Sequence, residues 1–259
     1  MKIAIIGAGN MGGAIARGIS QGTVIKAEDI HVSDPSAASL ERLKTFNPAI
    51  KTFQTNKEAI RDTDIVLIAV KPWLVAEVAK EIADELTDKQ TFISIAAGVS
   101  LSQLQDLFAK NSLFRIVPNT AIDVLQSVNT IATVNTTTEQ QQLVISIFNE
   151  LGKSYLVSET QLNALMALSS CGIAYAFRYI RAATEGGVEM GIYPNVAKQV
   201  VLQTLRGAID LLEKTDAHPE EEIDKVTTPG GITIKGLNEM EANGFSNAVI
   251  KGLKASLIK

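Results

Sequence analysis

A glycine-rich hexapeptide near the start of the chain has the spacing found in dinucleotide-binding loops. It reads Gly7-Ala8-Gly9-Asn10-Met11-Gly12, and it follows the apolar run 2–6 and precedes a segment of helical period. In such a loop the first glycine allows a tight turn, the second lets a pyrophosphate approach the backbone, and the third lets helix and strand pack closely. We predict that this hexapeptide binds a dinucleotide. A glycine-rich turn without a ligand is the alternative.

Loops after other predicted strands could line the same site, because open α/β sheets bind ligands at the carboxyl ends of their strands. The candidates are Val70-Lys71-Pro72, Ala97-Gly98, Asn56 and Asn119. Pro72 can start a helix, and Gly98 can bring backbone close to a planar ring. Taken alone, these residues are more often an ordinary helix start and an ordinary turn.

The end of the second predicted strand bears on the choice of cofactor. Residues 30–33 run into Asp34 about 20 residues beyond the glycine-rich turn, where dinucleotide folds meet the adenosine ribose. An acidic side chain accepts hydrogen bonds from the ribose hydroxyls of NADH and repels the 2′-phosphate of NADPH. No lysine or arginine lies between Ile30 and Leu40. We expect Ser33 and Asp34 to favour NADH over NADPH, although Asp34 could instead cap the next helix.

A second unusual loop lies near the C-terminus. Thr227-Thr228-Pro229-Gly230-Gly231-Ile232-Thr233 opens into an apolar-periodic run at Ile234, Leu237 and Met240. A helix N-terminus rich in glycine and hydroxyl groups offers amide and side-chain donors to a small anion such as a carboxylate. An ordinary helix cap made by Thr228 or Thr233 is an equally good interpretation.

These loops require an alternating frame of strands and helices. Short β-rich runs occur at 2–6, 30–33, 64–70, 91–95 and 114–117, separated by helical patterns at 11–20, 36–46, 74–86 and 100–108. The alternation predicts an α/β fold with a Rossmann-like, doubly wound parallel sheet. Runs at 127–134 and 154–157, with a helix at 139–151 between them, should extend one edge of that sheet.

From Ser158 onward the pattern is helical only. Ser158 and Gln161 have capping-box spacing, and Pro194 is suited to the first turn of another helix. We predict a dinucleotide-binding domain at 1–157 and an all-helical dimerisation and substrate domain at 158–259. The helical part carries more apolar surface than so few layers can bury, so we expect a second copy of the chain to cover it.

Composition excludes several classes of function. The 259 residues include 24 Lys plus Arg and 28 Asp plus Glu, a net charge of −4, which argues against nucleic acid as a partner. The apolar run 65–70 is too short to cross a membrane, and no secretory signal precedes Gly7, so we expect a cytoplasmic protein. With one cysteine, Cys171, and two distant histidines, His31 and His218, neither an internal disulfide nor a metal site is expected.

Together these motifs resemble Δ1-pyrroline-5-carboxylate reductase, along nearly the whole chain. The hexapeptide, Val70-Lys71-Pro72, Ala96-Ala97-Gly98-Val99, Pro118-Asn119-Thr120 and above all the Thr227–Thr233 loop carry the resemblance. It implies reduction of 1-pyrroline-5-carboxylate to proline with NADH or NADPH, and a homodimer that can build larger rings. It further implies that Thr228, Gly230, Gly231 and Ile232 hold the substrate carboxylate and that Thr233 bonds the ring nitrogen.

The chain departs from the family pattern at two places. It has Ser169-Ser170-Cys171-Gly172-Ile173 where relatives of this kind usually carry Ser-Gly-Ser-Gly-Pro, and Ala121 where they usually carry proline. Loss of the proline removes a helix-kinking device, and the bulkier Ser170 and Cys171 could narrow the pocket.

Two other functions stay open at this point. A β-hydroxyacid dehydrogenase or another imine reductase would share the dinucleotide domain, but the lysine of the hydroxyacid enzymes is missing from 172–185. A nucleotide-binding protein that has lost turnover would fit the altered 169–173 segment. Retention of Thr228, Gly230, Gly231 and Thr233 argues against that second alternative.

Overall fold

The structure is a computed structural model that describes residues 1–257, and it divides into two compact units. The first unit is Met1–Ser170, and the second begins at Cys171. The division between the units thus lies further along the chain than the change of composition at 157/158. Helix α7 (Glu159–Met166) consequently belongs to the first unit. The domain boundary at 157/158 stays a prediction.

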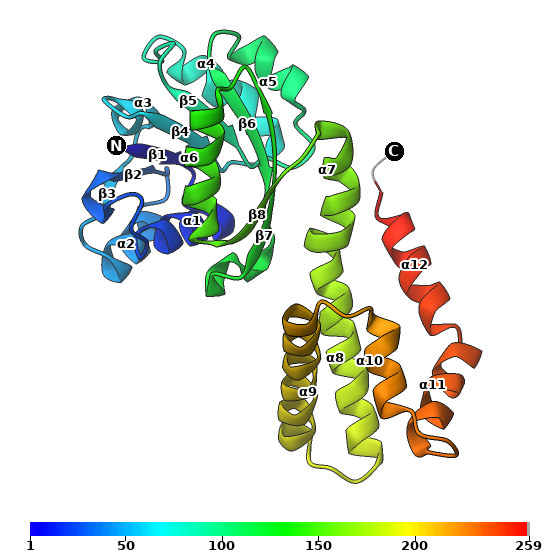
Figure 1. The fold of residues 1–259 in the computed structure, drawn as a ribbon. Coiled ribbons are helices and arrows are strands. Elements are labelled where there is room, and N and C mark those ends of the chain that lie inside the picture. The colour runs from blue at the N-terminus through cyan, green and yellow to red at the C-terminus, as the bar shows by residue number, and fades with distance from the viewer. Residues whose placement is uncertain (258–259) are drawn as a thin grey trace. The chain divides into compact units, whose positions relative to one another are not determined.

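Eight strands of the first unit form a single sheet in the order β3-β2-β1-β4-β5-β6-β7-β8 (Figure 1). Neighbouring strands are parallel except for β6 and β7, which are antiparallel. The strands are β1 Ile3–Ile6, β2 Ile30–Ser33, β3 Lys51–Phe53, β4 Ile65–Ile68, β5 Thr91–Ser94, β6 Ser112–Val117, β7 Ser127–Val134 and β8 Gly152–Leu156. The doubly wound sheet with its edge extension is thus confirmed.

Helices cover both faces of this sheet and bury a core on each face. One core holds Ile15 and Ile19 of α1, Leu43 of α2 and Phe148 of α6. The other holds Ile82 of α4 and Leu104 of α5, together with apolar residues of α3 and α7. The helices are α1 Asn10–Ile19, α2 Ala37–Phe46, α3 Asn56–Ile60, α4 Val75–Ile82, α5 Leu101–Leu107 and α6 Thr138–Asn149.

Two small elements depart from the sequence-based expectation. Strand β3 was not predicted, because it has three residues and lies partly exposed at the sheet edge. Asn56 does not lie in a loop as predicted; it is the first residue of the five-residue helix α3. Further along, the capping box predicted at Ser158 and Gln161 is confirmed at the start of α7.

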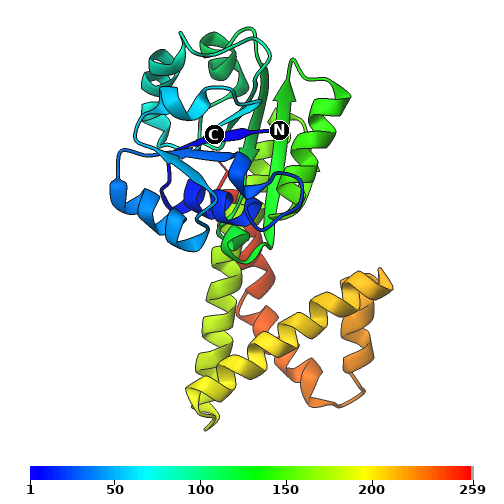
Figure 2. The same cartoon turned by 90° about the vertical axis from the view of Figure 1, so that its left-hand side faces the viewer.

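The second unit contains only helices among its described residues (Figure 2). They are α8 Gly172–Glu189, α9 Pro194–Thr215, α10 Pro219–Val226, α11 Ile232–Ala242 and α12 Phe245–Ala255. Helices α8 and α9 meet at Gly187, where an added Cβ would lie 2.9 Å from that of Ala197. These two residues alone are buried among the described residues of this unit. Within residues 1–257, no helix is long and apolar enough to span a membrane.

Candidate active site

A cleft of about 980 Å³ opens at the carboxyl edge of the sheet in the first unit. Strands β1 and β4 are neighbours there, although the chain forms β2 and β3 between them. The crossover helices consequently leave toward opposite faces, which creates a crevice at this point. Among the residues predicted for the cofactor, the cleft is lined by Gly7, Gly9, Asn10, Met11, Ser33, Asp34, Asn56, Val70, Lys71, Pro72 and Ala97.

Four predicted residues do not line the cleft. Ala8 donates its amide to Asp34 Oδ2 at 2.7 Å, and Gly98 lies in a turn with φ +78°. Asn119 is buried; its Oδ1 accepts from the Ala121 amide at 3.1 Å, so its side chain shapes the local turn. Gly12 lies on the packed side of α1, where an added Cβ would be 2.8 Å from the Ala69 Cβ.

The glycine-rich turn owes its shape to glycines at two positions. Gly7 has φ +103°, and an added Cβ there would lie 2.8 Å from the Ala69 carbonyl oxygen. A Cβ on Gly12 would lie only 2.0 Å from the Gly7 carbonyl oxygen. By contrast, nothing lies within 4 Å of the Cβ position of Gly9, which caps α1 without a side-chain hydrogen bond. The turn is therefore tight where it meets the protein and open where a pyrophosphate would approach.

Asp34 joins two loops at the edge of the cleft. Its Oδ2 accepts from the Ala8 amide, and its Oδ1 accepts from the Ser36 amide at 2.8 Å. The cap of α2 is Ser36 itself, whose Oγ accepts from the Ser39 amide. Each carboxylate oxygen keeps a further lone pair, so ribose contact and loop capping are compatible.

A hydrogen-bonded chain of side chains lies beside Asp34. Ser33 Oγ donates to Asn56 Oδ1 at 2.8 Å, and Asn56 Nδ2 donates to Glu81 Oε2 at 2.7 Å. Glu81 and Glu77, both on α4, line the cleft as well. Neither glutamate could be predicted as a cleft residue, because each occupies an ordinary exposed position of a predicted helix.

One residue of the altered segment 169–173 also reaches the cleft. Met166 and Ser170 line the cleft, and Ser170 Oγ donates to the Pro118 carbonyl oxygen at 3.1 Å. The segment Ala167–Cys171 forms a single π-helical turn between α7 and α8. Such turns insert an extra residue into a helix, so the helix has a local irregularity here without a proline.

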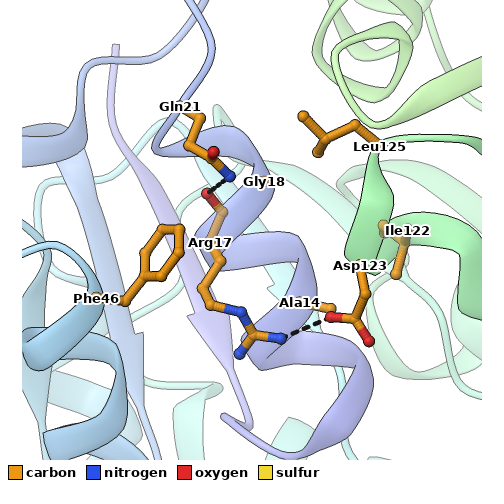
Figure 3. A pocket seen from close by; sticks show the side chains of 8 residues that line it. All are labelled: Ala14, Arg17, Gly18, Gln21, Phe46, Ile122, Asp123 and Leu125. Atoms are coloured by element: carbon orange, nitrogen blue, oxygen red, sulfur yellow. Dashed lines mark hydrogen bonds and ion pairs between the residues drawn. The ribbon is translucent and has the colours of Figure 1, made fainter.

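A second hollow, drawn in Figure 3, lies between α1 and the short 3-10 helix Thr120–Val124. Arg17 and Asp123 form an ion pair of 2.7 Å across it, and Gln21 Nε2 donates to the Arg17 carbonyl oxygen. Its volume of about 40 Å³ admits water but no metabolite. The Arg17–Asp123 ion pair links α1 to the segment that follows Asn119.

The Thr/Pro/Gly loop of the second unit forms a tight turn before α11. The Gly231 amide donates to the Thr228 carbonyl oxygen at 2.9 Å, and Gly230 has φ +71°, which gives a type II turn with Pro229 at its second position. A Cβ on Gly231 would lie 2.7 Å from Thr228 Oγ1. No side chain caps α11, so its first amides, including those of Ile232 and Thr233, remain available. The alternative of a threonine cap is not observed.

The remaining titratable candidates serve structure. Burial lowers the pKa of His31 on β2, and its Nδ1 lies 2.9 Å from the carbonyl oxygen of Ala59 on α3. His218 caps α10 by accepting from the Glu220 amide. Cys171 is a free, partly exposed thiol at the end of the π-helical turn. No group of three potential metal ligands occurs within residues 1–257.

Comparison with known protein families covers both parts of the chain. Residues 159–259 match the family described as "Pyrroline-5-carboxylate reductase dimerisation". Residues 2–98 match the family described as "NADP oxidoreductase coenzyme F420-dependent".

Individual relatives agree with these family matches. Pyrroline-5-carboxylate reductase 2 of Dictyostelium discoideum is 36% identical, over 100% of this chain and 91% of the relative. Pyrroline-5-carboxylate reductase 1 of the same organism is also 36% identical, over 98% of this chain, which spans about half (48%) of that relative.

Solved structures give the same result. That of Plasmodium falciparum pyrroline carboxylate reductase with NADP bound matches with a TM-score of 0.89 and 29% identity, over 99% of this chain and 95% of the other. Other oxidoreductases match at 13% to 16% identity and TM-scores of 0.51 to 0.65, which shows a shared fold alone.

Proposed function

The chain belongs to the pyrroline-5-carboxylate reductase family and reduces 1-pyrroline-5-carboxylate to proline, and we propose which residues bind the substrate and cofactor and which cofactor it prefers. The observation that carries the substrate proposal is the type II turn at Thr228–Gly231, which leaves the first amides of α11 without a partner. A nicotinamide dinucleotide supplies the hydride.

The cleft of the first unit is the proposed cofactor site. The pyrophosphate would lie over Gly9 and the start of α1, because no protein atom lies within 4 Å of a Cβ built on Gly9. Val70, Lys71, Pro72 and Ala97 line the cleft at the ends of neighbouring strands and would flank the rest of the dinucleotide. Gly12 supports this site through helix packing, and Ala8 supports it by its bond to Asp34.

NADH is the proposed preferred cofactor. Asp34 keeps a free lone pair on each oxygen for ribose hydroxyls, and the carboxylates of Glu77 and Glu81 line the same cleft. Lys71 is the one basic residue in that lining, so a 2′-phosphate would meet mostly negative charge. The matched NADP family and the NADP-bound relative make the opposite preference a real alternative.

The substrate carboxylate is proposed to bind the free amides of Ile232 and Thr233, flanked by Thr228, Gly230 and Gly231. A protonated cyclic imine is already electrophilic, so the protein must mainly position its carbon for hydride attack. The hydride forms the new C–H bond while the C=N π electrons pass to nitrogen, which becomes an amine. Thr233 would bond that nitrogen and orient the ring.

One kinetic experiment tests these proposals together. Purified full-length protein is mixed with pyrroline-5-carboxylate and either NADH or NADPH, and loss of reduced nicotinamide is compared with proline formed. Equal amounts of nicotinamide oxidised and proline formed, with a higher kcat/KM for NADH, is the expected result. A higher kcat/KM for NADPH would contradict the cofactor proposal. No proline with either cofactor would contradict the assigned reaction.

A homodimer, with rings of dimers as the larger assembly, is the proposed working form. Two observations support it. Residues 159–259 match a dimerisation family, and the second unit has almost no buried residues of its own among those described. A cytoplasmic location is also proposed, which the single cysteine supports because the fold needs no oxidising compartment. Cell fractionation tests the location.

A further inference from the structure

Asn56 is held from two sides, by one side chain that donates to its amide group and one that accepts from it. Ser33, at the end of β2, donates to its carbonyl oxygen at 2.8 Å. Glu81, on α4, accepts from its amide nitrogen at 2.7 Å. The three residues come from separate elements, and all of them line the cofactor cleft.

This arrangement allows one orientation of the Asn56 amide. A carboxylate offers acceptors only, so Glu81 must face the nitrogen of the amide group. If the amide turned over, its oxygen would face the Glu81 oxygen at hydrogen-bond distance, whereas the Ser33 hydroxyl could still accept from the amide nitrogen, so Glu81 is the partner that sets the orientation. Asn56 therefore keeps one N–H on Glu81 and has a second N–H left for another acceptor.

We propose that Glu81 is a positioning residue for the cofactor, because it fixes the Asn56 amide with its free N–H available to the dinucleotide. The inference rests on the proposed placement of the dinucleotide in this cleft. An amide that is already oriented loses less freedom on binding than one that must first choose between two orientations. Glu81 thus strengthens binding through Asn56, with no contact of its own required.

Glu77 provides a matched control. It lies one helical turn before Glu81 on α4 and lines the same cleft. Over residues 1–257, no hydrogen bond joins it to Asn56, whereas Glu81 has one. Replacing either glutamate removes the same charge, so only the effect of Glu81 should depend on Asn56.

The test is a double-mutant cycle read by cofactor binding. The Kd of the full-length protein is measured by nicotinamide fluorescence, using whichever of NADH and NADPH binds the wild type more tightly. The variants are Glu81→Ala, Asn56→Ala and the pair, with Glu77→Ala in both backgrounds. Glu81→Gln is the conservative replacement, because its amide oxygen can still accept from Asn56. Thermal unfolding checks that each variant is folded.

We expect Glu81→Ala to raise Kd about fivefold, the size of one net hydrogen bond, and to add nothing once Asn56 is alanine. Glu81→Gln should restore most of the affinity, and the effect of Glu77→Ala should be the same in both backgrounds. Additive effects of Glu81→Ala and Asn56→Ala would overturn the inference, as would a Glu81→Gln variant as weak as Glu81→Ala. A wild type that prefers NADPH would contradict only the cofactor proposal, since the cycle then uses NADPH.

Discussion

Thr233 lies in the first turn of α11 with its side chain exposed, directly after the free amide of Ile232. If its hydroxyl orients the ring nitrogen, Thr233→Ala should lower kcat about a hundredfold, the usual effect of removing one donor at a reacting centre. Cofactor Kd should stay within about twofold. Thr233→Ser keeps the hydroxyl and should retain most of the turnover. Unchanged kcat in the alanine variant would remove Thr233 from the mechanism.

Asp34 tests the proposed cofactor preference at a single position. Asp34→Ser removes the charge that a 2′-phosphate would meet, so the ratio of kcat/KM for NADPH to that for NADH should rise about tenfold, or about 1.4 kcal/mol. The same change breaks the bonds to the Ala8 and Ser36 amides, so both cofactors should bind more weakly. The ratio, measured under identical salt, is therefore the decisive quantity. A ratio equal to that of the wild type would mean that Asp34 only shapes the loops.

At the scale of elements, the turn between β1 and α1 separates a packing glycine from a binding glycine. Gly9→Ala places a methyl group where no atom lies within 4 Å, so the melting temperature should be unchanged while cofactor Kd rises at least about tenfold. Gly12→Ala places it 2.0 Å from the Gly7 carbonyl oxygen, so that variant should melt at a lower temperature. Calorimetry and cofactor titration on both variants measure the contrast. If Gly9→Ala binds as tightly as wild type, the pyrophosphate does not lie over Gly9.

The strands and helices of the chain show how far periodicity alone can predict secondary structure. Strand β2 has its predicted ends and β5 is one residue shorter than predicted, because both are short β-rich runs in which every residue is buried. Strand β3 and helix α3 were missed because they have three and five residues, too few to show a period. The π-helical turn at Ala167–Cys171 has no sequence pattern of its own.

The residues that line the cleft also divide into those that the sequence could predict and those that it could not. Residues in strand-end loops, such as Gly7 and Lys71, could be predicted to line the cleft because parallel strands end at one edge of the sheet. Glu81 and Met166 could not, since they reach the cleft from helices whose rotation and distance depend on tertiary packing. Gly98 and Asn119 were predicted by the same strand-end rule, but they do not line the cleft.

At the scale of the whole molecule, the second unit cannot be stable as a single chain by its own packing. Large apolar side chains are exposed on all five of its helices, among them Phe177, Val200, Val226, Ile232 and Ile250. Only Gly187 and Ala197 are buried among its described residues, and neither contributes much apolar area. A second copy of the chain would supply the missing core, in keeping with the dimerisation family that it matches.

This dependence on a partner predicts that stability changes with protein concentration. If folding and association are coupled, mass action raises the melting temperature as protein is added, whereas an independently folded monomer melts at a fixed temperature. Light scattering at micromolar concentration should give a dimer or a multiple of it. The helical signal should be lost at lower temperature as the protein is diluted, and activity should fall with it. A monomer whose melting temperature is the same over a hundredfold dilution would show that the second unit is stabilised within one chain.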